Sequence, residues 1–559
     1  LNSNESMLFQ SEFRVTVVSA TGQPMILPYP DGPTEGLDNE EQSIALLYHR
    51  EHTFAVGHGC SANWSSHTSG HERVSSVSAE SFPTVEVPST TPDIRREDGT
   101  LIDVPMAPLA GLIPNDDGMN AVEEVISRYE SWIADRRSEI RELPVQHRPA
   151  AEHHMDECQR SARRMRDGIA YLQSNPRARR AFQLANHAML LQQSRSRRTT
   201  RQIAYDKQSK RLSFDESHPP LYPVGRSAAW RPFQIAFLLT SLGSTADGDH
   251  SERETVELIW FPTGGGKTEA YLGLAAFSMF LRRLIDPEDT GTHVLMRYTL
   301  RLLTAQQFQR ASALTCAMEY VRGQYPKELG DQELSIGIWL GGESTPNTRK
   351  QALASLKELK SDPVYSRNQF ILTRCPWCGA QMGPARFGTD VPKSIPRVAG
   401  YETREDTVAL RCPDRECHFY DGLPVYVVDE DIYAVRPTLV IGTVDKFAML
   451  AWRPQARSLF GIDDHGKQVS SPPSLIVQDE LHLISGPLGS MVGLYETVIE
   501  ELCTDRRGEP AIPPKIISST ATIRRYADQI RALYARTDVA LFPPPGLHSG
   551  DSFFATHAR

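Results

Sequence analysis

IWFPTGGGKTEA, residues Ile259–Ala270, runs from an apolar segment through a glycine-rich loop into a segment with helical character. Glycine lets a backbone wrap closely around phosphate oxygens, and the N–H groups at the start of a helix bind anions. We therefore expect Lys267 to reach the β- and γ-phosphates of ATP and the Thr268 hydroxyl to bind Mg²⁺. The strict G-x-x-x-x-G-K-T pattern has glycine where this chain has Phe261. The other loop residues expected to bind the nucleotide are Thr263, Gly264, Gly265 and Gly266.

A second motif lies far downstream, in SLIVQDELHLI, where a short apolar strand ends in Asp479 and Glu480. A carboxylate at the end of a strand can hold Mg²⁺ through water, and its neighbour can orient or deprotonate an attacking water. We assign the metal role to Asp479 and the base role to Glu480. The alternative is a charged strand exit with no catalytic meaning.

These two motifs and SSTATI (Ser518–Ile523) resemble, in this order, motifs I, II and III of superfamily 2 helicases. The resemblance implies that motif III and the histidine of motif II couple the nucleotide to the nucleic acid. The residues at those positions are His482, Ser519, Thr520 and Thr522. By itself SSTATI would be only a turn or a helix cap.

Three weaker segments fit the same frame. AWRPFQIAFL resembles the motif that reads adenine, with Gln234 as the reader. MRYTLRLLTAQQ and IGTVDKFAML take the places of motifs Ia and Ib, whose side chains contact the nucleic-acid backbone without reading sequence. The residues expected to make those contacts are Arg297, Thr299, Arg301, Thr443 and Lys446, with Gln306 beside them. The alternatives are an ordinary amphipathic helix for the first segment and solvated loops for the other two.

Four of the eight cysteines form two pairs, Cys375 with Cys378 and Cys412 with Cys417. Four thiolates at such spacings suit a closed, tetrahedral zinc site with a structural role. The alternatives are buried free thiols or redox cysteines, and His418 is an alternative ligand to Cys417.

Apolar segments alternate with helical ones from about residue 226, which predicts a parallel α/β sheet. The expected strands are 256–261, 293–298, 334–340, 439–442, 475–478 and 515–518, and the expected helices are 269–284, 303–323, 349–359 and 489–502. Six regions are predicted: a β-rich N-terminal domain (1–120), a helical basic region (121–225), a RecA-like motor domain in two parts (226–364 and 436–535), a zinc-binding insertion between them (365–435) and a linker (536–559).

The composition, 40% hydrophobic and 23% charged with a net charge of −9, is ordinary for a globular chain. No apolar run reaches the roughly 18–20 residues that span a bilayer, and LNSNESMLFQ has no signal-peptide pattern, so we expect a cytoplasmic protein without membrane contacts. The first residue is Leu, so we expect a processed or trimmed chain.

Positive charge concentrates in 160–211, with fourteen Lys or Arg and two acids. Such a segment binds nucleic acid or an acidic partner, or is a solvated face.

FPTGGGKTEAYLG, RYTLRLLTAQQF, GTVDKF and especially QDELHLISGPLGSMVGLYE resemble the DrmA family, the helicases of the DISARM anti-phage defence system. FAVGHGCSANW and AFQLANHAMLLQQ are also similar to segments of that family. The resemblance is diffuse over about 40–559 and sharp over about 229–523. It implies two RecA-like domains, a DrmB-like partner, DNA with a free single-stranded end as ligand, and a system that includes a DNA methyltransferase.

The leading hypothesis is therefore an ATP-dependent DNA helicase or translocase subunit of a phage-defence complex. The alternatives are an ATP-gated scaffold that senses DNA ends without unwinding, and an RNA helicase. The residues after Thr522 are too few for a second RecA-like domain of about 150 residues with its arginine fingers. We expect this chain alone to bind ATP and to hydrolyse it poorly.

Overall fold

The computed structural model describes residues 13–30, 32, 36–65, 73–80, 82, 90–196, 199–206, 208, 211–222, 228–261, 266–299, 301–385, 391–392, 395–521 and 524–557, without the side chains of 196, 211, 301–305 and 557. The chain forms two compact units. The first contains residues 1–91, 131–159 and 544–559, and the second contains 92–130 and 160–543. Each is described by itself below.

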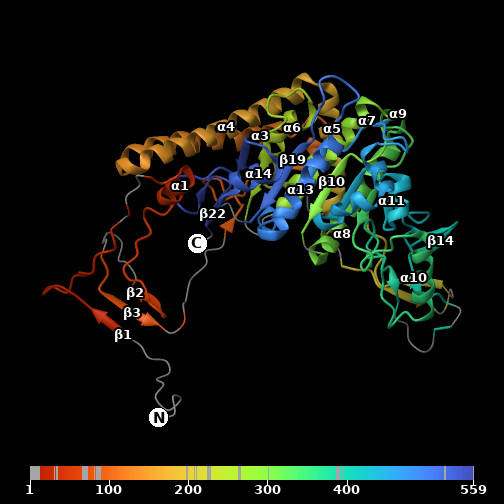
Figure 1. Cartoon of the computed structure of the whole chain (residues 1–559), viewed down its shortest axis with the longest axis horizontal. Helices are drawn as coiled ribbons and strands as arrows, with labels where there is room; N and C mark the ends of the chain where they lie inside the picture. The colour runs from red at the N-terminus through yellow and green to blue at the C-terminus, as the bar shows by residue number, and fades with distance from the viewer. Residues whose placement is uncertain are drawn as a thin grey trace, which may run out of the picture. The chain divides into compact units, whose positions relative to one another are not determined.

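An eight-stranded, all-parallel sheet forms the centre of the second unit (Figure 1). Its order is β16 (Val425–Tyr426), β11 (Ile336–Trp339), β17 (Leu439–Thr443), β10 (Val294–Tyr298), β18 (Leu475–Gln478), β19 (Lys515–Thr520), β9 (Val256–Trp260) and β20 (Val539–Phe542). The inner strands are buried along nearly all of their length, as expected of a parallel sheet covered on both faces. This confirms the predicted parallel α/β fold.

Amphipathic and apolar helices cover the sheet. They are α6 (Pro232–Ala246), α7 (Lys267–Ile285), α8 (Arg301–Gln324), α9 (Pro326–Leu329), α12 (Val444–Phe447), α13 (Gly486–Cys503) and α14 (Tyr526–Tyr534). Side chains of α13 and α14 join those of β9, β10, β17, β18 and β19 in one hydrophobic core. Residues 536–559, expected as a linker, contribute β20 to the sheet edge, because Val539 and Leu541 pack against that core.

Two long helices, α3 (Met119–Glu139) and α4 (Arg148–Ser174), contribute residues to both units, and α5 (Pro176–Ser196) packs on α7 and α8. The basic segment 160–211 finds acids far away in sequence. Arg164 pairs with Glu257 on β9, which is 1% exposed and also lies 3.0 Å from Lys515 Nζ. Arg180 and Arg201 pair with Glu328 and Asp414. Much of the basic charge is therefore structural.

Short strands and helices complete the second unit. They are α2 (Met106–Leu109), β5 (Val104–Pro105) paired with β8 (Ala229–Trp230), β6 (Ile203–Asp206) paired with β7 (Arg211–Phe214), α10 (Arg349–Ser361), and α11 (Asp429–Val435). The cysteine insertion adds the pairs β12 (Gly383–Pro384) with β13 (Val398–Ala399), and β14 (Tyr401–Arg404) with β15 (Thr407–Leu410).

The first unit is β-rich at its N-terminal end, as predicted. Its antiparallel sheet has the order β1 (Phe13–Thr16), β3 (Ser76–Glu80) and β2 (Ser61–Trp64). Helix α1 (Asn39–Leu47) begins with a capping box between Asp38 and Glu41. A second small sheet joins β21 (Asp551–Ser552), β22 (Ala555–His557) and β4 (Thr90–Thr91). Among the helices of both units, within the described residues, we find none with the length and apolarity needed to traverse a bilayer.

Candidate nucleotide-binding site

The carboxyl ends of the central strands bring the predicted motifs together. Because all strands run parallel, the residues that follow β9, β10, β18 and β19 lie along one edge of the sheet. Lys267 follows β9 at the start of α7, Asp479 directly follows β18, and Thr520 ends β19. Side chains separated by more than two hundred positions therefore share one site.

Gly266 caps α7 with a φ of 98°, a left-handed backbone that favours glycine. An added Cβ would lie 2.8 Å from Gln234 Nε2. That amide donates to the Gly266 carbonyl at 2.9 Å, and its oxygen accepts from the Arg231 N–H at 3.0 Å. Gln234, which is expected to read adenine, thus connects the phosphate loop to the start of α6 through both ends of its amide. Thr263, Gly264 and Gly265 lie outside the described residues.

Lys267 is folded back onto the start of its own loop. Its Nζ donates to the Phe261 carbonyl at 2.5 Å, and the residue is 8% exposed. Burial lowers the pKa of Lys267, while the nearby carboxylates of Glu480 and Asp479 act in the opposite direction. Lys267 is therefore a buried cation in the electrostatic field of two carboxylates.

Asp479 is held by three donors at the end of β18. The Glu480 N–H donates to its Oδ1 at 3.0 Å, the Ser519 hydroxyl also donates to Oδ1, and the Tyr271 hydroxyl donates to Oδ2 at 3.0 Å. Such donors fix a carboxylate in one orientation. Tyr271 carries no sequence motif. Its position four residues after Lys267, on a helix that is apolar and buried, was the only signal that could have found it.

Glu480 adopts a left-handed backbone, with a φ of 50°, at the entrance to the short 3-10 helix η6 (Leu481–Leu483). Burial raises the pKa of Glu480, and the neighbouring Asp479 raises it further, whereas Lys267 and His482 lower it. Strained backbone of this kind concentrates at functional sites. The side chain is 22% exposed, so it remains accessible to water.

His482 connects the motif II turn to β19. Its Nδ1 lies 3.2 Å from Thr520 Oγ1 and 3.4 Å from Glu480 Oε2. Gln529 of α14 donates to the carbonyls of Leu481 and Ile484, at 2.9 and 2.7 Å. The structure thus joins the expected coupling residues His482, Ser519 and Thr520 to the acidic pair, and Thr522 lies outside the described residues.

Three residues expected at the nucleic-acid interface are buried instead. Arg297 is 1% exposed and pairs with Glu496 at 2.6 Å, so its guanidinium is turned into the core. Lys446 pairs with Asp429 at 2.7 Å, and Thr443 is 1% exposed. Arg297 and Lys446 are held in the interior by the acids with which they pair, whereas no hydrogen-bond partner for the Thr443 hydroxyl lies among the described residues. Thr299 is half-buried. The side chain of Arg301 lies outside the described part.

The four paired cysteines meet in one buried cluster. Their sulfur atoms all lie within 4.8 Å of one another, with Cys375 and Cys417 at 4.0 Å and Cys378 and Cys412 at 3.3 Å. A tetrahedral zinc with bonds of about 2.3 Å places its sulfurs about 3.8 Å apart, so the cluster fits a metal ion. Cys417, and not His418, faces the other sulfurs. The His418 ring packs against Tyr320 and Phe419.

Arginines of the basic segment hold the cysteine cluster in place. The Arg195 guanidinium lies 3.6 Å from the centre of the Trp377 ring and donates to the Trp377 carbonyl at 3.0 Å. Arg201 donates to Asp414 at 2.7 Å, and the Asp414 N–H points to Cys412 Sγ at 3.4 Å. The cluster therefore ties α5 and the following loop to the insertion.

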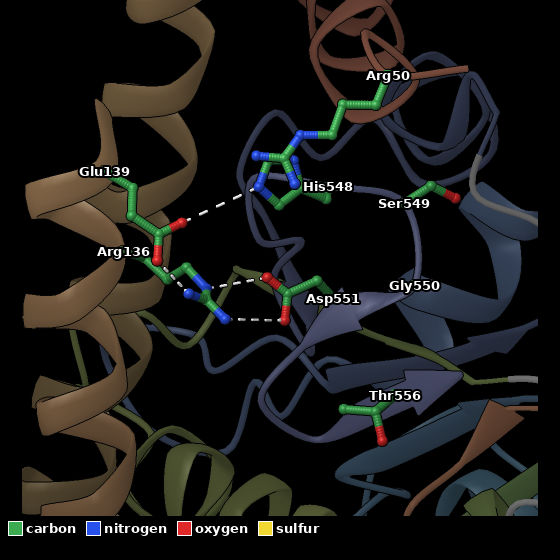
Figure 2. Close-up of a pocket in the computed structure, with 8 residues that line it drawn as sticks. All are labelled: Arg50, Arg136, Glu139, His548, Ser549, Gly550, Asp551 and Thr556. Atoms are coloured by element: carbon green, nitrogen blue, oxygen red, sulfur yellow. Dashed lines mark hydrogen bonds and ion pairs between the residues drawn. The ribbon is translucent and has the colours of Figure 1, made fainter. Parts of the chain in front are cut away.

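A pocket of about 650 Å³ lies in the first unit (Figure 2). Arg136 lies between two acids there, with Nε 2.9 Å from Asp551 Oδ2 and a second contact to Glu139. His548 Nε2 is 4.0 Å from the same Glu139. No residue of the helicase-like motifs lines the pocket, and its acids are already paired with bases. The candidate catalytic chemistry therefore lies at the sheet edge and not in this pocket.

Comparison with known proteins gives one strong likeness. No family model matches the sequence. Over 99% of its length the chain is 34% identical to the DISARM protein DrmA of Bacillus paralicheniformis, which confirms the resemblance inferred from the motifs. The chain spans 50% of the length of that protein.

Solved helicase structures are less similar to this chain than the relative just named. The DUF1998 helicase MrfA bound to DNA is 14% identical, with a TM-score of 0.28 over 56% of this chain and 27% of that one. The DEAD-box helicase Mss116 bound to ssRNA and UDP-BeF is 11% identical, with a TM-score of 0.30 over 56% of this chain and 40% of that one. These TM-scores are too low to support a functional argument.

Proposed function

Because the chain is similar to the DISARM protein DrmA along nearly all of its own length, we propose that it forms the nucleotide-binding part of an ATP-hydrolysing helicase or translocase that acts on DNA in phage defence. One observation carries the proposal. Lys267, Thr268, Asp479 and Glu480 converge at the carboxyl edge of the sheet, with Lys267 facing both carboxylates. This is the set of groups that phosphoryl transfer from ATP requires.

Thr268 and Asp479 would hold Mg²⁺. Hydroxyl and carboxylate oxygens are ligands that Mg²⁺ prefers, and the two groups fit a common ion because both lie within 3.3 Å of the same Tyr271 hydroxyl. When bound, the ion supplies positive charge to the phosphate oxygens. Lys267 supplies a second positive charge there once its Nζ leaves the Phe261 carbonyl for a phosphate.

Glu480 is the proposed base that orients and deprotonates the attacking water. The raised pKa of Glu480 brings it nearer to neutrality, where a base accepts a proton most effectively. Asp479 is less suited to that role because three donors already occupy its two oxygens. The different surroundings of the two carboxylates therefore support different roles.

His482, Ser519 and Thr520 are the proposed link between nucleotide and DNA. Ser519 contacts Asp479 and Thr520 contacts His482, so a change at the acidic pair reaches β19 directly. Thr299 and Arg301, at the end of β10, remain the proposed contacts to the DNA backbone. Arg297, Thr443 and Lys446 are excluded from that set in this conformation by their burial.

The four cysteines are proposed to bind one structural zinc ion. All four sulfurs are enclosed, which leaves no open position for a substrate.

We further propose a cytoplasmic location, a single-stranded DNA end as ligand, a DrmB-like partner and a methyltransferase in the same system. These proposals follow from the likeness to DrmA, and no contact in the chain identifies them.

The decisive experiment measures ATP hydrolysis with and without DNA for the wild-type protein, Lys267→Ala and Glu480→Gln, in the presence of co-purified partners. We expect DNA to stimulate the wild type and both variants to lose at least about 100-fold in turnover. Wild-type turnover in both variants would overturn the proposal. Strand displacement with matched DNA and RNA overhangs then separates a DNA helicase from an end-sensing scaffold and from an RNA helicase.

A further inference from the structure

We propose that Tyr271 is a positioning residue of the magnesium-nucleotide site, with its hydroxyl holding Asp479 and Thr268 in the geometry that binds the metal. The Tyr271 oxygen lies 3.0 Å from Asp479 Oδ2 and 3.3 Å from Thr268 Oγ1. These are the two side chains proposed above as metal-binding groups, one on α7 and the other after β18. The inference rests on the proposed function and names a residue that no motif assigns.

The direction of the hydrogen bonds follows from the single proton of a hydroxyl. Bonds to a charged acceptor are shorter and stronger than bonds to a neutral one, so the Tyr271 proton goes to the carboxylate of Asp479. The lone pairs of the Tyr271 oxygen then face the hydroxyls of Thr268 and Tyr298, each 3.3 Å away.

The acceptor sites of Asp479 show what this bond achieves. A carboxylate has about four lone-pair sites. The Ser519 hydroxyl and the Glu480 N–H occupy Oδ1, and Tyr271 occupies one site on Oδ2. One site on Oδ2 therefore stays open, and its direction is fixed by the other three bonds. Without the Tyr271 hydroxyl, Oδ2 has no donor among the described residues, and only the two bonds at Oδ1 orient the carboxylate.

The helix geometry explains how one residue reaches both groups. Tyr271 is three positions after Thr268, so the two side chains lie on the same face of α7. The ring is 0% exposed, and close packing around it fixes where the hydroxyl points. Hydrogen-bond partners of this kind typically change metal affinity by 10–100-fold when they are removed.

Tyr298 provides a matched control. It is also a buried tyrosine, and its hydroxyl bonds to that of Tyr271 but to neither Thr268 nor Asp479 in the described part of the chain. Tyr298→Phe therefore also removes a tyrosine hydroxyl from this cluster, but one that contacts Tyr271 and neither of the metal-binding groups. A general loosening of the cluster would affect both variants, whereas a positioning role affects Tyr271→Phe alone.

The experiment compares the wild type, Tyr271→Phe and Tyr298→Phe in the full protein, using binding as the main readout. Affinity for fluorescent ADP is measured across a Mg²⁺ titration and in EDTA, and Mn²⁺ binding with ADP is followed by electron paramagnetic resonance. We expect Tyr271→Phe to need roughly 10-fold more Mg²⁺ or Mn²⁺ for half-saturation, with affinity in EDTA changed less than about twofold. Tyr298→Phe should shift the metal requirement less than about twofold.

Two outcomes overturn the inference: a wild-type metal titration in Tyr271→Phe, or equal shifts in both variants. If the wild type binds no nucleotide at all, the proposed function fails instead. Should Tyr271→Phe not fold, 3-fluorotyrosine placed at position 271 keeps the hydroxyl, and its ¹⁹F signal should broaden with Mn²⁺ and ADP together but not with ADP alone. A signal that is indifferent to Mn²⁺ would equally reject the inference.

Discussion

Arg297 on β10 and Glu496 on α13 form an ion pair that is closed to solvent, with 2.6 Å between Nη1 and Oε2 and 1% exposure for each side chain. Arg297 Nε and Nη2 and Glu496 Oε1 have no further hydrogen-bond partner in the described part of the chain. Each of the two charged groups therefore depends mainly on the other to offset the free-energy cost of its burial. It also joins the strand of motif Ia to the helix that follows motif II.

Removing one member of this pair should destabilise the protein strongly, because it leaves an uncompensated buried charge. We expect Glu496→Gln to lower the free energy of unfolding by about 3–5 kcal/mol. The double variant Arg297→Met with Glu496→Leu should lose much less, because it buries no charge. Urea denaturation measures both. Two results together would contradict this prediction: a loss in the free energy of unfolding below about 1 kcal/mol for Glu496→Gln, and weaker DNA binding for Arg297→Met. They would show that Arg297 contacts DNA.

The position of Arg297 shows where sequence reasoning ends. The run VLMRY identifies a strand, and its place before LRLLTAQQ identifies motif Ia. Alternation along a strand puts neighbouring side chains on opposite faces, but the sequence does not say which face is covered by which helix. The partner of Arg297 is a glutamate 199 positions away. Only tertiary structure reveals that pairing.

The cysteine cluster should hold about one zinc ion per chain. We expect Cys378→Ser to lose most of the bound zinc, because three sulfurs and a hydroxyl make a weaker site than four thiolates. Hydrogen exchange should then rise in the insertion and around Arg195 and Arg201, whose side chains pack on it. Cys60→Ser is the control, since Cys60 is exposed and outside the cluster. Full zinc content in Cys378→Ser would reject the assignment.

The clustering of the four cysteines and the convergence of Lys267 with Asp479 and Glu480 could be predicted because each depends on short, local patterns. The paired cysteines and the strand-loop-helix around Lys267 need only a few neighbours in sequence. The basic segment was less predictable, because its count of charges could not show that Arg164 meets Glu257 inside the sheet. The sequence also could not show that the Gln234 amide bonds both to the phosphate loop and to the start of α6, and its role as adenine reader stays a prediction.

Asp429 should make stability depend on pH. Burial raises the pKa of Asp429 to about 6, although the Lys446 ammonium at 2.7 Å acts in the opposite direction. The folded value exceeds the unfolded value of about 3.9, so the folded state holds the proton more tightly. This contribution to stability is complete below the unfolded pKa and is lost as the pH rises through 6.

The measurement compares the wild type with Asp429→Asn by urea denaturation from pH 4 to 7. Relative to the variant, the wild type should lose about 2–3 kcal/mol across that range, which corresponds to a shift of about two pKa units. Asp464→Asn is the control, because Asp464 is 96% exposed. If the difference in the free energy of unfolding between the wild type and Asp429→Asn stays constant with pH, folding does not raise the pKa of Asp429.

Glu480 and His482 should together set the acid limb of ATP hydrolysis. A base works in its ionised form, so activity should fall as the pH drops through the raised pKa of Glu480. The His482 ring, with Nδ1 3.4 Å from Glu480 Oε2, lowers that pKa. In His482→Ala this influence is gone, so the acid limb should move to higher pH. The control is His465→Ala, which replaces an exposed histidine away from the site. DNA-stimulated kcat/KM from pH 5 to 9 measures the limb, and a shift to lower pH in His482→Ala would show that another group titrates.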